Sequence, residues 1–336
     1  MTPGERLFEM VSGYRVTQFV RTAALLGICD ELADEPRDAE AVAAAVGADP
    51  GLLLRLLRAL AGSGVLEEGE DGRFRNTPVG DLLRRDVPGG LRDVAIALPE
   101  DRSWAAWGAL PTAIRDGVVP FEVANGRSFW EALAGDPDAA SDFNRFMVEQ
   151  TEVFAPQLLQ ACDFSESERV VDVGGGNGAL IAQVLVAHPA LRATLFDLES
   201  GLEGADAYLR GRGVRDRCEL AAGSFFDTVP AGADTYLLKY ILHDWDDGRA
   251  AEILAVCRRA MRPGARLVVV DHVLPARAVD APRERRALTV DMQMHVLFGS
   301  RERTEAELRA MLAAAGFAVE KVVPTAPPST IVARAV

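Results

Sequence analysis

VVDVGGGNGAL, residues Val170–Leu180, joins an apolar strand to a glycine-rich turn and then to the start of a helix. Glycines let the backbone approach a ligand closely, and the first turn of a helix presents free N–H groups. Asp197 ends the next predicted strand, 19 residues after Gly178, where a carboxylate can accept hydrogen bonds from both hydroxyls of a ribose. We therefore predict a site for an adenosine-containing cofactor in this half of the chain.

The glycine spacing does not by itself identify that cofactor. Gly174, Gly176 and Ala179 also fit the G-x-G-x-x-A dinucleotide fingerprint, so NAD and S-adenosylmethionine both stay open on this evidence. The non-functional alternative is a tight structural turn followed by an exposed aspartate at a strand end. Residues further along the chain have to discriminate between these possibilities.

Strands and helices alternate from residue 170 to the C-terminus. Apolar runs predict strands, and residues 178–188 and 247–261 have the spacing of helices between them. This alternation is typical of an α/β fold, with a mostly parallel sheet covered by helices on both faces. The last two strands have no helix between them, so we expect an antiparallel hairpin at one edge. The predicted strands are 170–174, 192–198, 218–226, 235–242, 266–274, 317–324 and 329–336.

The first hundred residues predict short helices followed by a hairpin. Residues 16–34 carry apolar side chains at helical spacing, Asp38 can cap a short helix that ends at Gly47, and Asp49 can cap the next one. Residues 65–78 look like two strands around a tight turn. Helices followed by a β-hairpin are typical of a winged helix.

A winged helix raises the possibility of DNA binding, which the charges disfavour. Residues 1–100 contain 11 basic and 17 acidic side chains, a net charge of −6, whereas DNA-binding modules are basic. The hairpin that would contact DNA is itself acidic. We therefore expect no nucleic-acid partner. Instead, the apolar helices are expected to pack against a second copy and form a homodimer.

Composition excludes several other classes. The chain has 336 residues, of which 49% are hydrophobic and 26% charged, with a net charge of −14; these values indicate a globular protein of two domains that does not bind polyanions. No apolar run approaches the roughly 18 residues of a membrane span, and the N-terminus does not look like a secretory signal. We therefore expect a cytoplasmic protein without a membrane partner.

Neither the cysteines nor the histidines are spaced like metal ligands. Cys29, Cys162, Cys218 and Cys257 form no C-x-x-C pair, and the four histidines form no ligand pair at helical spacing. We predict no metal.

The segment 101–163 is helical in pattern and rich in aromatic residues. Interdomain core packing and a wall over a flat aromatic ligand use the same residue types, so both interpretations stay open. The sequence thus suggests three parts: 1–100, a winged-helix region; 101–163, linking helices; and 164–336, the cofactor-binding domain.

Several sequence blocks together resemble those of a known enzyme family. The chain resembles the family-2 O-methyltransferases, which include plant phenolic methyltransferases and bacterial polyketide-tailoring enzymes. Similar blocks run almost end to end, and LHDWDD (242–247) and RERTEAE (301–307) are the most specific of them. The resemblance implies a winged-helix dimerisation domain, a Rossmann-like class I methyltransferase domain, and S-adenosylmethionine rather than NAD. The product would be S-adenosylhomocysteine.

The resemblance also implies which residues hold the cofactor. Gly174 and its neighbours would bind the amino-acid portion, and Asp197 would bind the ribose. Ser224 and Phe225 would flank the adenine, and Lys239 matches a further cofactor-contacting position. The family often has an acidic residue where Ser224 stands, so its hydrogen bond to adenine is expected to be weaker.

His243 matches the general base of the family. Methyl transfer to a phenol needs a positioned nucleophile and a route for its proton. A phenol has a pKa of about 10 and an imidazole about 6.5, and carboxylates beside an imidazole narrow such a gap. Glu302 matches one of these carboxylates. Asp271 stands where relatives often have glutamate, with a reach one methylene shorter.

The acceptor would be a small aromatic or polyketide-type phenol of secondary metabolism, including antibiotic biosynthesis. Two alternatives are an NAD-dependent oxidoreductase and a family member diverted to hydroxylation or decarboxylation, although such a relative is expected to lose the base. A third is a non-catalytic binding or regulatory protein. The predicted acceptor pocket consists of Trp107, Phe143, Met147, Met294, His295 and Phe298.

Overall fold

The computed structural model describes residues 1–85, 87–324 and 328–336. They form two compact units, one of Met1–Trp104 with Asp138–Gln150 and one of Ala105–Pro137 with Thr151–Val336. The segment 101–163 contributes to both units, and the three-part division suggested by the sequence stays a prediction. Within the described residues, no helix is long and apolar enough to cross a membrane.

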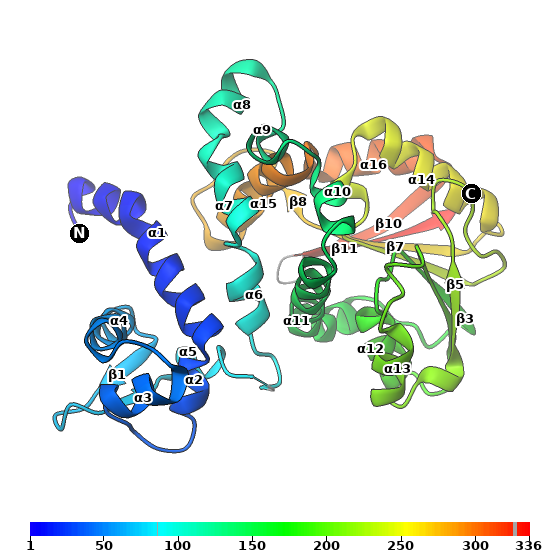
Figure 1. Ribbon diagram of the computed structural model, residues 1–336. Coiled ribbons are helices and arrows are strands. Elements are labelled where there is room, and N and C mark those ends of the chain that lie inside the picture. The colour runs from blue at the N-terminus through cyan, green and yellow to red at the C-terminus, as the bar shows by residue number, and fades with distance from the viewer. Residues whose placement is uncertain (86, 325–327) are drawn as a thin grey trace. The chain divides into compact units, whose positions relative to one another are not determined.

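The first unit combines helices with a two-stranded antiparallel hairpin (Figure 1). Asp38 and Asp49 each accept a hydrogen bond from a backbone N–H of the first helical turn, at 2.8 Å, so both predicted caps are confirmed. The order of helices and hairpin also agrees with the prediction. The elements are α1 (Pro3–Leu26), α2 (Ile28–Glu31), α3 (Ala39–Val46), α4 (Pro50–Gly62), β1 (Leu66–Glu68), β2 (Phe74–Asn76), α5 (Pro78–Asp81) and α6 (Arg92–Ala97).

Helix α1 carries an apolar face that this unit does not cover. Five large apolar side chains in its N-terminal half are each more than half exposed. A contiguous apolar surface of this kind is unusual on a monomer and is typical of an interaction face. The five residues are Leu7, Phe8, Met10, Val11 and Tyr14.

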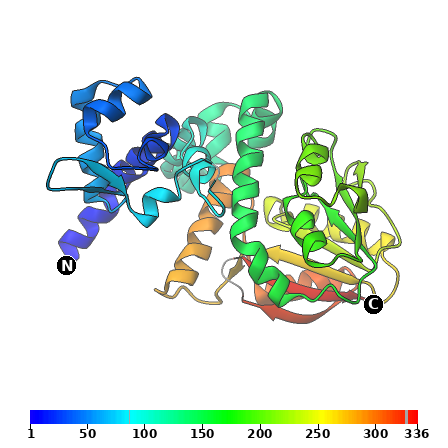
Figure 2. The same ribbon diagram turned by 90° about the horizontal axis from the view of Figure 1, so that it is seen from below.

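The second unit is built on a seven-stranded sheet of order β10-β11-β7-β6-β3-β4-β5. Strands β7, β6, β3, β4 and β5 are parallel, whereas β10 and β11 form an antiparallel edge. Figure 2 shows these red C-terminal strands at one margin of the unit. The predicted α/β class and its antiparallel edge are confirmed. The strands are β3 (Arg169–Val173), β4 (Arg192–Asp197), β5 (Cys218–Ala222), β6 (Thr235–Lys239), β7 (Arg266–Asp271), β10 (Phe317–Val323) and β11 (Ser329–Ala335).

Helices cover both faces of this sheet, with α14 and α16 on one side and α12 and α13 on the other (Figure 1). Alternate side chains of β6 and β7 point to the α14 and α16 side, where Tyr236, Leu238, Leu267 and Val269 join one buried cluster. The helices are α8 (Leu110–Asp116), α9 (Pro120–Asn125), α10 (Phe129–Ala134), α12 (Ala179–Ala187), α13 (Ala205–Gly211), α14 (Asp247–Ala260), α15 (Pro282–Phe298) and α16 (Glu305–Ala314), with α7 (Asp101–Gly108) and α11 (Pro137–Ala161) shared between units.

Three predicted strands end at least three residues earlier than expected; one of them, 266–274, divides into β7 and the separate strand β8 (Val273–Leu274). Strand β5 stops at Ala222 rather than 226, because the next residues turn and the Phe226 N–H donates to Ser224 Oγ. Strand β6 stops at Lys239 rather than 242, because Tyr240 adopts a left-handed φ of 56°. This conformation is strained for a bulky residue, and such strain is concentrated at functional sites.

Candidate active site

The glycine turn and Asp197 meet at the carboxyl edge of the sheet. Asp197 Oδ2 accepts a 2.7 Å hydrogen bond from the Gly176 N–H, and Oδ1 accepts one of 2.7 Å from the Leu198 N–H. A Cβ on Gly174 would lie 2.5 Å from Ile241, whereas one on Gly176 would meet nothing within 4 Å. The turn is therefore packed tightly against the protein on one side and open on the other.

An aspartate and a lysine interact near this turn: Asp172 is buried and Lys239 is partly buried. Burial raises the pKa of Asp172 to about 7, and Lys239 opposes that shift. Burial lowers the pKa of Lys239 to about 8, while Asp172, Asp244 and Asp271 act to raise it. The Lys239 ammonium donates to Thr151 Oγ1 at 3.0 Å. Asp172 was not among the sequence-predicted site residues, since it reads as an ordinary position in a buried strand.

Ser224 and Phe225 follow the end of β5 at the same edge as Asp197. Ser224 Oγ accepts from the Phe226 N–H at 3.2 Å, and the Phe225 ring makes edge-on contacts with Phe226 and Trp245. These contacts hold an aromatic face beside the strand end. The hydroxyl of Ser224 can still donate a hydrogen bond to a ligand.

An adenosyl cofactor fits these groups. The Asp197 oxygens each keep a lone pair for a ribose hydroxyl, the backbone over Gly176 is open, and helix α12 begins at Ala179 with its N–H groups directed at the turn. Open α/β sheets bind their ligands beyond the carboxyl ends of the strands, which is where these residues lie.

His243 lies at the same edge, in the short 3₁₀ helix η2 (Leu242–Asp244) that follows β6. Its ring is buried, and Nδ1 lies 2.7 Å from Glu302 Oε1. Asp271, the last residue of β7, has its Oδ1 3.9 Å from the same nitrogen. Three predicted residues from separate segments are therefore brought together. Glu302 is within hydrogen-bond distance of the imidazole, and the shorter Asp271 is beyond it.

The carboxyl groups around His243 are held in an environment that disfavours their charge. Burial raises the pKa of Asp271 to about 7, with His243 opposing the shift and Glu302 adding to it. Burial also raises the pKa of Glu302 well above its usual value; Asp291 adds to the shift and Arg303 opposes it. Burial disfavours the ionised form of these carboxyls. A positive charge on the His243 imidazole would favour that form.

The sequence reasoning missed a further carboxylate next to His243. Asp244 Oδ1 lies 3.4 Å from His243 Nε2, and burial raises the pKa of Asp244 to about 7, opposed by His243. Glu302 therefore occupies one side of the imidazole, and Asp244 lies near the other. The signal was available, because Asp244 belongs to the same LHDWDD motif.

Tyr240 was missed as well, since nothing in its local sequence indicates a strained backbone. Its ring is parallel to His243, at 5.1 Å between centroids and 4° between planes, and also to His272, at 5.6 Å and 9°. The Tyr240 hydroxyl lies 3.5 Å from His272 Nε2. Burial lowers the pKa of His272 to about 3, so that ring is neutral. His272 is thus a neighbour of the site.

The six predicted acceptor residues are only partly brought together. On α15, Met294 is buried, His295 is half-buried, and the Phe298 ring stacks on Trp130 at 5.3 Å. Trp107 is partly exposed on α7. Phe143 and Met147 belong to the other compact unit, so their place in a pocket with the others stays a prediction.

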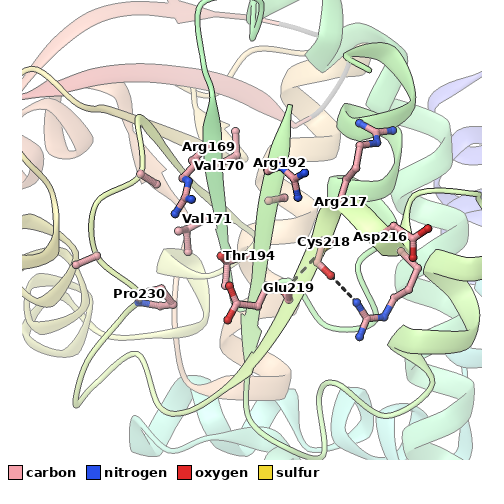
Figure 3. A pocket seen from close by; sticks show the side chains of 14 residues that line it. Arg169, Val170, Val171, Arg192, Thr194, Asp216, Arg217, Cys218, Glu219 and Pro230 are labelled. Carbon is pink, nitrogen blue, oxygen red and sulfur yellow. Dashed lines mark hydrogen bonds between the residues drawn. The ribbon is translucent and has the colours of Figure 1, made fainter. Parts of the chain in front are cut away.

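A cavity of about 290 Å³ lies at the opposite, amino edge of the sheet (Figure 3). It is lined by Arg169 and Arg192, the first residues of β3 and β4, so a strand length of roughly 16 Å separates it from the catalytic edge. Arg217 in its wall already donates to three backbone carbonyls, and Arg215 to one. These arginines therefore serve the fold.

No group of His, Cys, Asp and Glu side chains in the described residues could hold a metal ion. The four cysteines, all of them within that part of the chain, are buried free thiols.

Comparison with known proteins assigns the chain to a family. The O-methyltransferase domain profile matches residues 107–318, and the O-methyltransferase dimerisation domain profile matches residues 8–86. Phenazine O-methyltransferase PhzM of Lysobacter antibioticus is 40% identical over 326 residues, 97% of this chain and 94% of the relative. The crystal structure of LaPhzM covers 100% of both chains with a TM-score of 0.94 and 39% identity.

A second solved structure is similar and holds ligands. It is the O-methyltransferase NcsB1 from neocarzinostatin biosynthesis in complex with S-adenosylmethionine and 2-hydroxy-5-methyl naphthoic acid, 33% identical with a TM-score of 0.79 over 96% of each chain. The family match also removes the NAD-dependent oxidoreductase as an interpretation. This chain therefore belongs to the O-methyltransferase family, and it is an S-adenosylmethionine-dependent enzyme of that family.

Proposed function

We propose that this enzyme methylates a phenolic hydroxyl of a small aromatic natural product, with His243 as the general base. The observation that carries the proposal is the 2.7 Å contact between His243 Nδ1 and Glu302 Oε1. With Nδ1–H donating to Glu302, the Nε2 lone pair is left to accept the proton of the acceptor hydroxyl.

The cofactor is held by the opposite part of the same sheet edge. The backbone around Gly174 and Gly176 takes the amino-acid portion, Asp197 takes the ribose hydroxyls, and Ser224 with Phe225 takes the adenine. Lys239 supplies a cation nearby. S-adenosylmethionine, when bound, supplies an electrophilic methyl group whose leaving group is a neutral thioether, so the protein needs no acid to expel it.

The base has to work against an unfavourable proton transfer. The gap between a phenol and an imidazole, about 3.5 pKa units, corresponds to nearly 5 kcal/mol. Glu302 and Asp271 favour the imidazolium as the proton arrives, because a buried carboxylate gains from a positive neighbour. Asp244, near Nε2, is positioned to orient the acceptor hydroxyl or to receive its proton after transfer.

The residues proposed to line the acceptor pocket and the ligands of related proteins both indicate the class of the acceptor. Trp107, Phe143, Met147, Met294, His295 and Phe298 are proposed to form an apolar pocket for a planar ring. NcsB1 binds a hydroxynaphthoic acid, and PhzM is named for a phenazine. A fused or substituted aromatic phenol of antibiotic biosynthesis is the acceptor we propose. Diversion to hydroxylation or decarboxylation is disfavoured, because His243 and its carboxylate partner are both present.

The test is methyl transfer to a panel of phenols, read by mass spectrometry. Suitable acceptors are 1,4-dihydroxy-2-naphthoic acid, 3-amino-4-hydroxybenzoate and 2,7-dihydroxy-5-methyl-1-naphthoate. With an accepted phenol, His243→Ala is expected to lower kcat about 10²–10⁴-fold, whereas the control His188→Ala, which changes a histidine at the far end of α12, leaves it unchanged. Unaltered turnover in His243→Ala would remove the base from the mechanism.

We further propose a cytoplasmic homodimer joined through the N-terminal unit. The dimerisation profile over residues 8–86 and the exposed apolar face of α1 support the dimer, and four reduced cysteines suit a reducing compartment. Light scattering is expected to give twice the chain mass, and Phe8→Glu on α1 to shift it towards one chain.

A further inference from the structure

Among the described residues, the largest of the fully buried side chains is an arginine, and it lies beside the proposed catalytic pair. Arg303 has 2% of its surface exposed, which is rare for arginine unless its donors are all engaged. It follows Glu302 directly in the sequence. Neither the family resemblance nor the chemistry of methyl transfer gave it a role, so its burial calls for an explanation.

The guanidinium of Arg303 spans the turn that carries His243. Nη1 donates to the Leu242 carbonyl and Nη2 to the Trp245 carbonyl, each at 2.8 Å. These carbonyls lie one residue before and two residues after His243. A third donor, Nε, reaches Asp247 Oδ1 at 2.9 Å, at the start of α14. The planar fork of arginine suits this arrangement, because its donors have a fixed geometry.

The backbone of Arg303 is fixed from its other side. Arg303 is paired with Val273, and Thr304 with Leu274, in a short parallel ladder between β9 (Arg303–Thr304) and β8 (Val273–Leu274). This ladder begins two residues after Asp271. Thr304 then caps helix α16 through a reciprocal pair of hydrogen bonds with Glu307. The backbone of Arg303 is therefore fixed independently of the hydrogen bonds that its side chain makes to the His243 turn.

We infer that Arg303 is a positioning residue that sets the distance between His243 and Glu302. Its side chain holds the backbone on both sides of His243, while its own backbone adjoins Glu302. One residue thus couples the base to the carboxylate that orients it. This inference rests on the proposed role of His243 as the base.

The decisive variants are Arg303→Lys and Arg303→Met. Lysine keeps the positive charge but lacks the planar guanidinium donors, and methionine lacks both. The matched control is Arg301→Met. Arg301 is exposed and also binds Asp247, at 3.2 Å, but it has no hydrogen bond to the turn. With an accepted phenol, both Arg303 variants are expected to lower kcat about 100-fold, because a displacement near 1 Å is sufficient for that loss. KM and the affinity for S-adenosylhomocysteine stay within about threefold.

A nuclear magnetic resonance measurement needs no acceptor and so separates this inference from the proposed function. The chain has only four histidines, so ¹⁵N-histidine labelling with His243→Gln assigns the Nδ1 proton that faces Glu302. In Arg303→Lys this proton is expected to move upfield and broaden, and in Arg301→Met to stay as in the wild type.

The pH profile distinguishes the effect of the positive charge of Arg303 from the effect of its guanidinium hydrogen bonds to the His243 turn. Arg303 lowers the pKa of both Asp271 and Glu302, so Arg303→Met should shift the acid limb of kcat to higher pH, and Arg303→Lys should not. Further groups that face these carboxyls are His243, Asp244, Tyr240, Lys239 and Asp291.

Two results would overturn the inference. One is an Arg303→Lys enzyme with wild-type kcat and an unchanged Nδ1 proton. The other is a parallel loss of S-adenosylhomocysteine binding and of the thermal unfolding transition in Arg303→Lys, which would make Arg303 a general stability residue. If Arg303→Met does not fold, Arg303→Lys alone decides.

Discussion

Replacing Glu302 by glutamine changes the catalytic pair by one charge and almost no volume. The bond it perturbs joins His243 Nδ1 and Glu302 Oε1 over 2.7 Å, within the range of a charge-assisted hydrogen bond. Both side chains are buried, so solvent screens the interaction weakly. A hydrogen bond to a charged group contributes about 1.5–3 kcal/mol. That range corresponds to a fall in rate of roughly 10- to 150-fold.

The loss should appear in kcat rather than in binding. The imidazole becomes positive only as the acceptor gives up its proton, so the carboxylate acts mainly in the transition state. The assay is steady-state methyl transfer to an accepted phenol, with calorimetric binding of S-adenosylhomocysteine as the measure of an intact site. Glu305→Gln is the matched control, because Glu305 lies three residues away, is exposed, and binds Arg309 instead.

Two outcomes would contradict this reasoning. If Glu302→Gln keeps kcat within twofold while His243→Ala is inactive, the base does not depend on its buried carboxylate. If the variant loses S-adenosylhomocysteine binding to the same extent as turnover, Glu302 supports the fold of the site and the catalytic interpretation is wrong.

Three other predictions concern the cofactor turn and its buried charges. Gly175→Ala is expected to weaken S-adenosylhomocysteine binding at least tenfold by calorimetry, because its Cβ would lie 2.6 Å from Asp172 Oδ2; wild-type affinity would contradict the tight packing of the turn. Asp197→Asn should weaken the same binding by roughly 10- to 150-fold, the range for hydrogen bonds to a charged group, and Asp206→Asn, on a partly exposed aspartate of α13 that pairs with Arg210, should not. Asp172→Asn should raise the unfolding free energy by clearly more at pH 8 than at pH 5. A carboxyl whose folded pKa is raised to about 7 destabilises the fold progressively as pH rises from about 4 to 7, by at most about 4 kcal/mol; equal chemical-denaturation midpoints at pH 8 would refute this.

The sequence predicts the fold of the proposed cofactor half of the site, because the elements of that half are local. The strand, turn and helix of 170–180 are contiguous, and Asp197 ends the adjacent strand, so periodicity and glycine spacing suffice to place them. Glu302 and Asp271 required the family resemblance, since Glu302 is 59 residues from His243 and no local pattern links them. The prediction that Asp271 reaches less far agrees with its 3.9 Å separation.

The sequence reasoning missed Tyr240 and Arg303 because the conformation of the first and the burial of the second are set by tertiary structure. Tyr240 bends the chain with a positive φ that neither its residue type nor its neighbours indicate. Arg303 belongs to a residue type that is normally exposed, so only the three-dimensional arrangement of two backbone carbonyls explains its burial. The predicted strands 218–226 and 235–242 were too long because apolar residues continue past the sheet edge, where Phe226, Ile241 and Leu242 still pack in or against the core cluster of this unit.

The architecture separates binding from proton transfer. The groups proposed to bind the cofactor follow β3, β4 and β5, and they are held by backbone hydrogen bonds within that part of the sheet. The proposed base follows β6, and its partner and the arginine that spans its turn come from residues 302 and 303. Substitutions at residues 302 and 303 are therefore expected to abolish deprotonation without touching the cofactor turn. A chain of this family that keeps the first half and loses the second should bind S-adenosylmethionine and yet transfer no methyl group to a neutral phenol, because the imidazole would lose the orientation that presents Nε2 to the acceptor hydroxyl.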